Sequence, residues 1–386
     1  MIILTEGCLM KIIKRGIVYR AKEGPCRYQA WPTVCKDEKG VLYAAWSGHR
    51  ASHVCPFGMD LMSVSLDGGE SWDCPRIIND TWMDDRDAGL TYLGNGEMLL
   101  TYFHHPKTVY SNEWRSWILD DTKEDNAVFR KMLEGYLAAY DEMDDETETP
   151  GSFLKKSYDY GRSWGEAIKV PIFAPHGAVL TGSGRLLYLG KENSGALSRY
   201  RKLERSDDPT PEEDRNRIFL YESFDKGLSW EKVSRLPLPE GFEDKFYEPH
   251  VAELQSGELV AAIRSHDEVA YHNFSMHFLN SNDGGKSWSQ PRTYEISGSP
   301  PHLLVRKDGS VIVSYGRREA PSSIRAVVSY DGCRSFGEEM VLSDAPDGDM
   351  GYPATVELED GSLVTVYYQR YEKDIRTSIM YTKWRM

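Results

Sequence analysis

The residues of this 386-residue sequence that could do chemistry lie in short polar segments beside apolar, strand-like stretches. One group follows such stretches and comprises Arg50, His53, Arg264, His266, Arg317 and Arg318. A second group precedes them and comprises Asp85, Arg86, Asp87, His176, Glu248, His250, His302 and Tyr352. Charged and imidazole side chains gathered on a rigid scaffold bind small polar ligands. No His, Cys or Glu spacing suggests a metal centre, and the sequence has no Gly-rich phosphate loop or nucleophile-elbow motif.

A Ser-x-Asp-x-Gly-x-x-Trp motif, the Asp box, indicates which elements carry those segments. It reads SLDGGESW at 65–72, SYDYGRSW at 157–164, SFDKGLSW at 223–230 and SNDGGKSW at 281–288, with a degenerate copy, SYDGCRSF, at 329–336. The aspartate can accept backbone N–H bonds within a turn, glycine permits positive φ, and tryptophan packs between strands. We therefore interpret the Asp box as a structural hairpin turn and not as a catalytic site.

A second repeat, a glycine turn followed by a β-rich apolar stretch, occurs six times, from EKGVLYAAW to EDGSLVTVYY. Each copy follows a short strand, and the first five precede an Asp box, so each unit predicts four antiparallel strands. Six such units predict an all-β fold, a single six-bladed β-propeller over residues 1–386. The sixth unit has no Asp box, so we expect residues 12–20 to close the ring by pairing with 379–385.

Propeller geometry assigns the polar segments to one face. Asp-box turns lie on one rim, whereas loops that follow second strands or precede first strands lie on the other. We therefore expect the ionisable residues to surround the axis on the face opposite the boxes, as a binding site. The alternative is that these loops are polar only because they are solvated.

Residues 107–151 depart from the repeat. This acidic segment contains DNAVFRKMLEGYLAAYDEM, whose apolar residues recur at helical spacing, with Asp125 or Asn126 as N-cap. It predicts a helical insertion in the second blade that forms a flap beside the pocket, as a gate or an oligomer contact. The alternative is a peripheral decoration. A shorter polar loop, 193–215, occupies the same position in the third unit.

Composition excludes several function classes. The formal net charge of −14 at pH 7 argues against a nucleic-acid partner. No apolar run approaches the roughly 20 residues of a membrane span, and the N-terminus is a poor signal peptide. Six scattered cysteines without a C-x-x-C pair indicate reduced thiols. We expect a cytoplasmic protein with no membrane partner and no cofactor, and the sequence does not predict its oligomeric state.

With its Asp boxes on six predicted blades, the chain resembles the sialidase (neuraminidase) superfamily over nearly all of its length outside 107–151. The resemblance implies a tyrosine nucleophile, a glutamate partner and three arginines for the sugar carboxylate. Tyr352 in GYPATVELEDGSL, and Glu248 with Arg264 in YEPHVAELQSGELVAAIRS, occupy the matching places. The candidates for the third arginine are Arg318 or Arg317, with Arg325 a weaker one.

Two places depart from the family pattern. Where the family has an Arg-Ile-Pro motif, this sequence has QAWPTV, with Ala30 in the arginine's place. Arg50, Arg27 or Arg86 could supply the missing guanidinium. The place of the family's aspartate acid/base falls near His53, and the nearest aspartate is Asp60. We therefore predict His53 as the acid/base, with Asp60 as the alternative. The remaining substrate-binding candidates are Arg50, Arg86, Asp87, His250 and His302.

A sugar whose anomeric carbon bears a carboxylate repels a carboxylate nucleophile, whereas a neutral phenol activated by a glutamate avoids that repulsion. The resemblance thus implies a retaining exo-glycosidase that removes a terminal acidic sugar, sialic acid or a relative, with Glu248 as general base for Tyr352. Two alternatives remain at this point. One is an enzyme for a uronate- or rhamnose-containing glycan with His53 central, and the other is a carbohydrate-binding propeller without catalysis.

Overall fold

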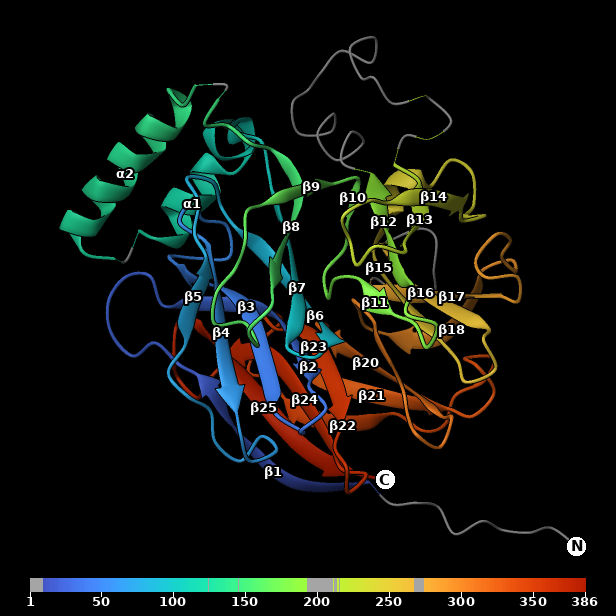
Figure 1. Ribbon diagram of the computed structural model, residues 1–386. Helices are drawn as coiled ribbons and strands as arrows, with labels where there is room; N and C mark the ends of the chain where they lie inside the picture. Colours follow the sequence, from blue (N-terminus) through green and yellow to red (C-terminus); the bar gives the residue numbers. More distant parts are fainter. Residues whose placement is uncertain are drawn as a thin grey trace, which may run out of the picture.

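Six antiparallel sheets form the predicted six-bladed propeller (Figure 1). The computed structural model describes residues 10–123, 125–144, 146–192, 211, 214, 216–266 and 274–386. Neighbouring blades contact one another through their inner strands, in a closed ring that runs from β2 through β6, β11 and β12, β15, β19 and β23 back to β2. The ring fixes the relative positions of loops that are far apart in the sequence.

Short strands joined by tight glycine turns make up each blade. The first three blades comprise β2 (Tyr28–Lys36), β3 (Leu42–Arg50), β4 (Met59–Ser65) and β5 (Arg76–Asn79); β6 (Arg86–Gly94), β7 (Glu97–His104), β8 (Gly151–Ser157) and β9 (Ile168–Val170); and β10 (Ile172–Phe173), β11 (Val179–Leu180), β12 (Leu186–Glu192), β13 (Ile218–Ser223) and β14 (Glu231–Arg235). A 3₁₀ turn, η3 (Glu243–Lys245), leads into the fourth blade. The last three comprise β15 (Phe246–Glu253), β16 (Leu259–Ser265), β17 (Ser275–Ser281) and β18 (Arg292–Ser297); β19 (His302–Val305), β20 (Val311–Arg317), β21 (Ser323–Ser329) and β22 (Met340–Asp344); and β23 (Gly351–Glu357), β24 (Leu363–Arg370) and β25 (Thr377–Arg385) with β1 (Lys11–Tyr19).

The N-terminal strand closes the ring, as predicted. β1 pairs antiparallel with β25, from Lys11 opposite Arg385 to Tyr19 opposite Ile379, and the two lie side by side in Figure 1. The sixth blade is therefore assembled from both ends of the chain. Val18 is 6% exposed and belongs to the core cluster that joins the first and sixth blades.

Deleting residues 1–20 should lower the thermal unfolding midpoint by several degrees. The deletion exposes the edge of β25 and removes Val18, whose burial alone is worth about 1.5–3 kcal/mol. Deleting residues 1–9, which leaves β1 intact, provides the matched control. Calorimetry of the two variants measures the difference, and equal midpoints would show that the closing strand contributes no stability.

The Asp boxes form one repeated hydrogen-bonded turn. In the first box, the Asp67 carboxylate accepts hydrogen bonds from the Ser65 hydroxyl at 2.8 Å and from the Ser71 amide at 2.9 Å. The Ser71 hydroxyl also donates to it, and these bonds lower the pKa of Asp67 to about 2. The same contacts recur in the other four boxes at Asp159, Asp225, Asp283 and Asp331. The structural interpretation of the motif is thereby confirmed.

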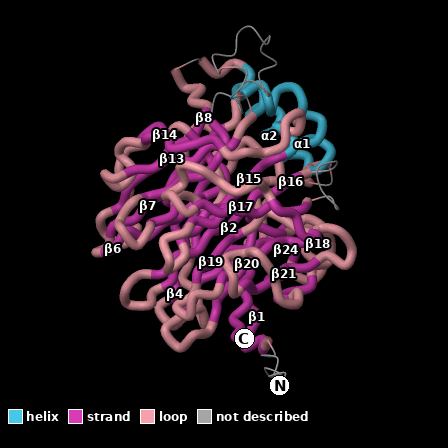
Figure 2. Tube along the Cα trace, turned by 90° about the vertical axis from the view of Figure 1, so that its right-hand side faces the viewer, coloured by secondary structure: helices cyan, strands magenta, loops and turns pink. Residues whose placement is uncertain are grey.

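The predicted helical insertion leaves the second blade between β7 and β8. It comprises a π-helical turn, η1 (Val109–Glu113), and helices α1 (Arg115–Asp121) and α2 (Ala127–Asp141), which gather on one side of the strands (Figure 2). Asn126 is the N-cap of α2, because its side chain accepts a hydrogen bond from the Phe129 amide at 2.9 Å. Ile118 and Leu133 pack against Val54 of the β3–β4 loop in one apolar cluster. Most of the loop predicted at 193–215 lies outside the described residues.

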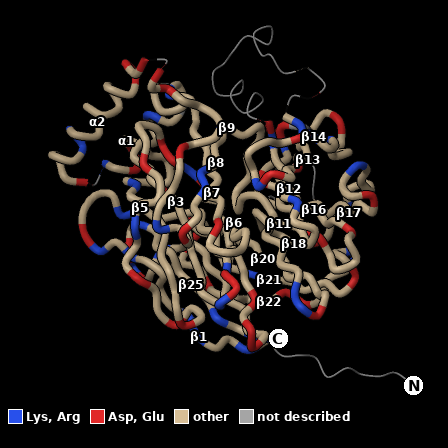
Figure 3. The backbone as a smooth tube through the Cα atoms, in the orientation of Figure 1, with Lys and Arg blue, Asp and Glu red and all other residues tan. Residues whose placement is uncertain are grey.

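The described residues also show the length and apolarity of the helices, the state of the cysteines and the distribution of charge. Within the described ranges, no helix is long and apolar enough to span a bilayer. Cys26, Cys35, Cys55, Cys74 and Cys333 are free thiols. Basic and acidic residues are interspersed along the described blades (Figure 3), so electrostatic recognition depends on local clusters of side chains.

Candidate active site

A pocket of about 270 Å³ opens at the end of the propeller axis opposite the Asp boxes. All six blades and the helical insertion contribute to it. Its lining comprises Trp31, His53, Arg86, Asp87, Phe103, His104, His105, Pro106, Trp114, Gly151, Ser152, Phe173, Lys191, Asn216, Tyr247, Glu248, Arg264, Arg318 and Tyr352. The volume lies near the lower end of the range for small-ligand sites, which suits one sugar ring.

Four inner strands enter the pocket through the same backbone irregularity. The pairing of β2, β6, β15 and β23 with their neighbours shifts register, and a non-glycine residue at each shift has positive φ. These are Trp31 at 53°, Asp87 at 54°, Glu248 at 45° and Tyr352 at 48°. Such backbone costs about 1–3 kcal/mol per residue and clusters at functional sites. Here all four residues line the pocket, three of them directly before a proline.

Tyr352 and Glu248 meet across the pocket from the sixth and fourth blades. The Tyr352 hydroxyl donates a hydrogen bond to one Glu248 oxygen, and the Arg264 guanidinium donates to the other. Burial, with the charge of Glu248 added, raises the pKa of Tyr352 well above its usual 10. The phenol is therefore neutral at ordinary pH and needs a base before it can act as a nucleophile. Glu248 lies where that base is required.

Three guanidinium groups line the pocket, those of Arg86, Arg264 and Arg318. Arg318 donates to the Tyr368 hydroxyl at 3.1 Å. Arg86 lies over the Trp31 ring, with its guanidinium carbon 4.1 Å from the ring centroid. Of the arginines weighed from the sequence, Arg27, Arg317 and Arg325 do not line the pocket. Of the candidates for the third arginine, Arg318 alone lines the pocket, and of those for the first arginine, Arg86 alone does.

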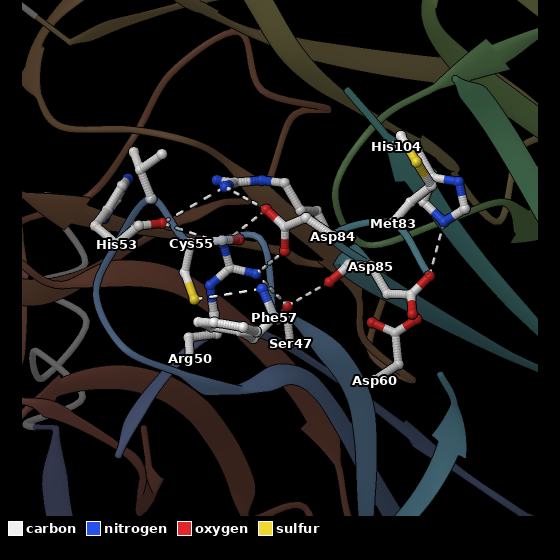
Figure 4. Close-up of polar contacts among 12 residues, drawn as sticks. Ser47, Arg50, His53, Cys55, Phe57, Asp60, Met83, Asp84, Asp85 and His104 are labelled. Atoms are coloured by element: carbon white, nitrogen blue, oxygen red, sulfur yellow. Dashed lines mark hydrogen bonds and ion pairs between the residues drawn. The ribbon is translucent and has the colours of Figure 1, made fainter. Parts of the chain in front are cut away.

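Arg50 has a different position from the one predicted, because its side chain is fully buried. Its guanidinium faces both carboxylate oxygens of Asp84, with Nη2 at 2.9 Å from Oδ2 (Figure 4). Burial alone would raise the pKa of Asp84, but the charges of Arg50 and Arg86 outweigh it and hold the pKa below its usual range. The Tyr110 hydroxyl, from the insertion, donates to the same carboxylate at 2.6 Å. Arg50 therefore lies outside the pocket lining and holds Asp84, which in turn contacts Arg86 at 3.3 Å.

The structure places His250 and His302, predicted as substrate contacts, outside the lining of this pocket. These two rings pack with His176 beneath Tyr352, with ring centroids 4.8–5.7 Å apart, and they line the channel on the Asp-box side instead. The Leu303 amide donates to His250 Nδ1 at 3.0 Å, and burial lowers the pKa of His250 to about 4. The three neutral imidazoles form the floor under the pocket. Among the described residues, no group of three or more His, Cys, Asp or Glu is arranged to hold a metal ion.

His53 lines the pocket and is held by two groups that sequence reasoning did not find. The Tyr28 hydroxyl lies 2.8 Å from His53 Nδ1, and Asp349 Oδ1 lies 3.4 Å from the same nitrogen. Tyr28 also donates to Asp349 at 2.8 Å. Burial lowers the pKa of His53, an effect that Asp349 partly offsets. With Nδ1 occupied in this way, Nε2 is the ring nitrogen available for proton transfer in the pocket.

The two aspartates considered beside His53 lie in different environments. Asp60 is fully buried, accepts a hydrogen bond from Asn79 at 3.1 Å and does not line the pocket, so it is placed outside the site (Figure 4). Asp87 does line the pocket. Burial raises the pKa of Asp87 to about 7, with the charge of Glu248 adding to the effect and Arg86 opposing it. A carboxyl group of that pKa is partly protonated near neutral pH.

Several lining residues were not predicted from the sequence, among them Trp31, Trp114, Lys191 and Tyr247. One signal could have found Trp31, because a residue before proline near the start of an inner strand recurs in AWPTV, YEPHV and GYPAT. No comparable signal marks Trp114, which arrives from the insertion. Asp349 lies on the loop before β23 and reaches His53 across the junction of the first and sixth blades.

Comparison with known proteins bears on the fold and the repeat. The BNR repeat-like domain matches residues 104–366. A protein of unknown function from Dyadobacter fermentans is similar at TM-score 0.72 and 20% identity, covering 98% of this chain and 99% of its own. The NanB sialidase from Streptococcus pneumoniae is similar at TM-score 0.64 and 13% identity, covering 96% and 70%. The intramolecular trans-sialidase from Ruminococcus gnavus is similar at TM-score 0.60 and 15% identity, covering 96% and 97%.

No curated protein matches the chain at a significant level. At 13–20% identity, the solved structures bear on the fold alone. The domain match covers more than half of the chain and includes four of the five Asp boxes. The chain therefore belongs to the BNR repeat-like domain family and has the sialidase-like six-bladed propeller fold.

Proposed function

We propose that the protein is a retaining exo-glycosidase that removes a terminal acidic sugar, sialic acid or a relative, from a glycan. The observation that carries the proposal is the Tyr352–Glu248 hydrogen bond in a pocket lined by three guanidinium groups. Glu248 and the partly protonated Asp87 are the carboxyl groups in the lining, so guanidinium charge exceeds carboxylate charge there. Such a pocket attracts an anion, and arginine's planar fork suits a carboxylate.

In the proposed first step, the Tyr352 oxygen attacks the anomeric carbon while the glycosidic C–O bond breaks. The phenolic proton passes to Glu248, and a proton from His53 Nε2 passes to the leaving oxygen, which departs as an alcohol. In the second step, water attacks the same carbon and gives a proton to His53, while Glu248 returns its proton to the Tyr352 oxygen. Two displacements at one carbon retain its configuration.

A second candidate, an enzyme for a uronate-containing glycan, is favoured by one observation. Ala30 occupies the place of the arginine in the family's Arg-Ile-Pro motif, whereas the Arg86 guanidinium lines the pocket stacked on the neighbouring Trp31 ring. The substrate carboxylate would then be held from β6 and not from β2, as expected for a sugar whose carboxylate is not on the anomeric carbon. Turnover of α-sialosides compared with glucuronides and other uronides separates the two candidates. Sialoside turnover supports the first candidate, and uronide turnover alone supports the second.

Arg318→Gln should raise KM for the acidic glycoside by roughly 10- to 100-fold, since a hydrogen bond to a charged group is worth about 1.5–3 kcal/mol. Arg317→Gln is the matched control, because this neighbouring arginine does not line the pocket. Steady-state kinetics on the best substrate of the panel measures both. Equal effects at the two positions would remove Arg318 from the carboxylate site. Absence of turnover and of binding across the whole panel would refute the glycosidase function.

A further inference from the structure

The helical insertion brings two tryptophans to the mouth of the pocket. Trp114 lines the pocket, and Trp117, in the first turn of α1, is 51% exposed. The Trp117 ring lies parallel to the His53 ring, at 14° between planes and 6.1 Å between centroids. The Trp114 and Trp117 rings are 6.5 Å apart and nearly perpendicular. Together they form an aromatic corner next to the proposed proton donor.

Trp117 does not belong to the apolar cluster that holds the insertion in place. That cluster is formed by residues such as Ile118, Phe129 and Leu137, which are 0–4% exposed. The insertion is also held by polar contacts, because Arg376 donates to the Asp121 carbonyl at 3.0 Å and lies 3.4 Å from an Asp125 oxygen. The corner is therefore carried by an anchored element, and the exposed face of Trp117 is free to meet a ligand.

We propose that Trp117 and Trp114 form the subsite for the leaving group, and that this group is a neutral hexopyranose that stacks the C–H face of its ring on Trp117. The inference rests on the proposed function, because His53 can protonate the glycosidic oxygen only if that oxygen lies beside it. The sugar on the far side of the oxygen must then lie next to the ring that stacks on His53. A flat aromatic surface and an apolar sugar face are complementary.

A kinetic comparison of two substrates tests the subsite. Both carry the same acidic sugar, but one has methanol as leaving group and the other has lactose, as in methyl α-sialoside and sialyllactose. Trp117→Ala should lower kcat/KM for sialyllactose about three- to tenfold, the range for one aromatic contact. It should leave the methyl glycoside unchanged. Trp82→Ala is the matched control, since Trp82 is 68% exposed and does not line the pocket.

The rival explanation is that Trp117 only supports the His53 ring. In that case Trp117→Ala would impair both substrates equally and would also shift the pH profile of the methyl glycoside, and the subsite would be rejected. Loss confined to sialyllactose supports the subsite, whereas no loss on either substrate rejects it.

Binding without turnover separates the subsite from the proposed function. Sialyllactose is titrated into Tyr352→Phe protein, and saturation-transfer NMR reports which sugar protons contact the protein. If the subsite is correct, saturation is transferred to the galactose protons. This transfer should disappear when Trp117→Ala is added to the Tyr352→Phe protein and persist when Trp82→Ala is added instead. Transfer to sialic acid protons alone rejects the subsite and leaves the function standing. If sialyllactose does not bind at all, sialic acid is rejected as the substrate of the proposed function, and the subsite is rejected with it.

Discussion

Tyr352→Phe should reduce kcat at least about a thousandfold while leaving the fold intact, as expected for loss of a covalent nucleophile. Glu248→Gln should be similarly harmful, because the buried phenol has a raised pKa and depends on this carboxylate to remove its proton. The double variant should lose little more than either single variant, since groups that act as a unit are not additive. Steady-state kinetics, with circular dichroism to confirm folding, measures all three.

Tyr367→Phe is the matched control for the nucleophile. Tyr367 is a buried tyrosine on β24 whose hydroxyl contacts Thr382 at 2.9 Å, outside the pocket lining. A fluorinated glycosyl fluoride of the acidic sugar, which slows the second step, should add one sugar to the wild-type protein, and peptide mass spectrometry should place it on Tyr352. A label on another residue, or strictly additive losses in the double variant, would contradict the pair.

His53→Ala should impair a natural glycoside far more than an activated one. An effective proton donor contributes about 10²–10⁴-fold, whereas a nitrophenyl or methylumbelliferyl leaving group departs with little protonic help. The loss in kcat/KM on sialyllactose should therefore lie in that range, with a small effect on the aryl glycoside, whose hydrolysis should become limited by the second step. Equal effects on both substrates would show that His53 is not the proton donor.

The pH profile provides an independent test of the same residue. His53 must be protonated to act as an acid, and burial lowers its pKa from 6.5, so kcat/KM should fall as pH rises through a value below 6.5. Asp349→Asn removes the charge that raises the His53 pKa and should move this alkaline limb to lower pH. An alkaline limb near pH 7 that survives in His53→Ala would instead assign the donor to Asp87, whose pKa is about 7.

The repeats in the sequence determined the blade architecture. An Asp box is a local turn whose bonds all form within a few residues, as at Ser65, Asp67 and Ser71, so its pattern can be read without tertiary structure. Ring closure by β1 followed from the missing sixth box, and the helices of the insertion followed from 3.6-residue periodicity. The rim that carries the pocket also followed, because a four-stranded blade fixes which loops share a face.

The sequence by itself could not decide which side chains on that rim enter the pocket. Arg50 and His53 are three residues apart on one loop, yet the first is buried against Asp84 and the second lines the pocket. His250 lies on the same inner strand as Glu248, and His302 begins the inner strand of the fifth blade, but both rings form the floor beneath the pocket. These outcomes depend on backbone bulges and on partners in other blades, such as Asp349 for His53 and Tyr110 for Asp84. Contacts such as the one between His53 and Asp349, which are 296 positions apart, leave no local pattern, because the closed ring alone brings such residues together.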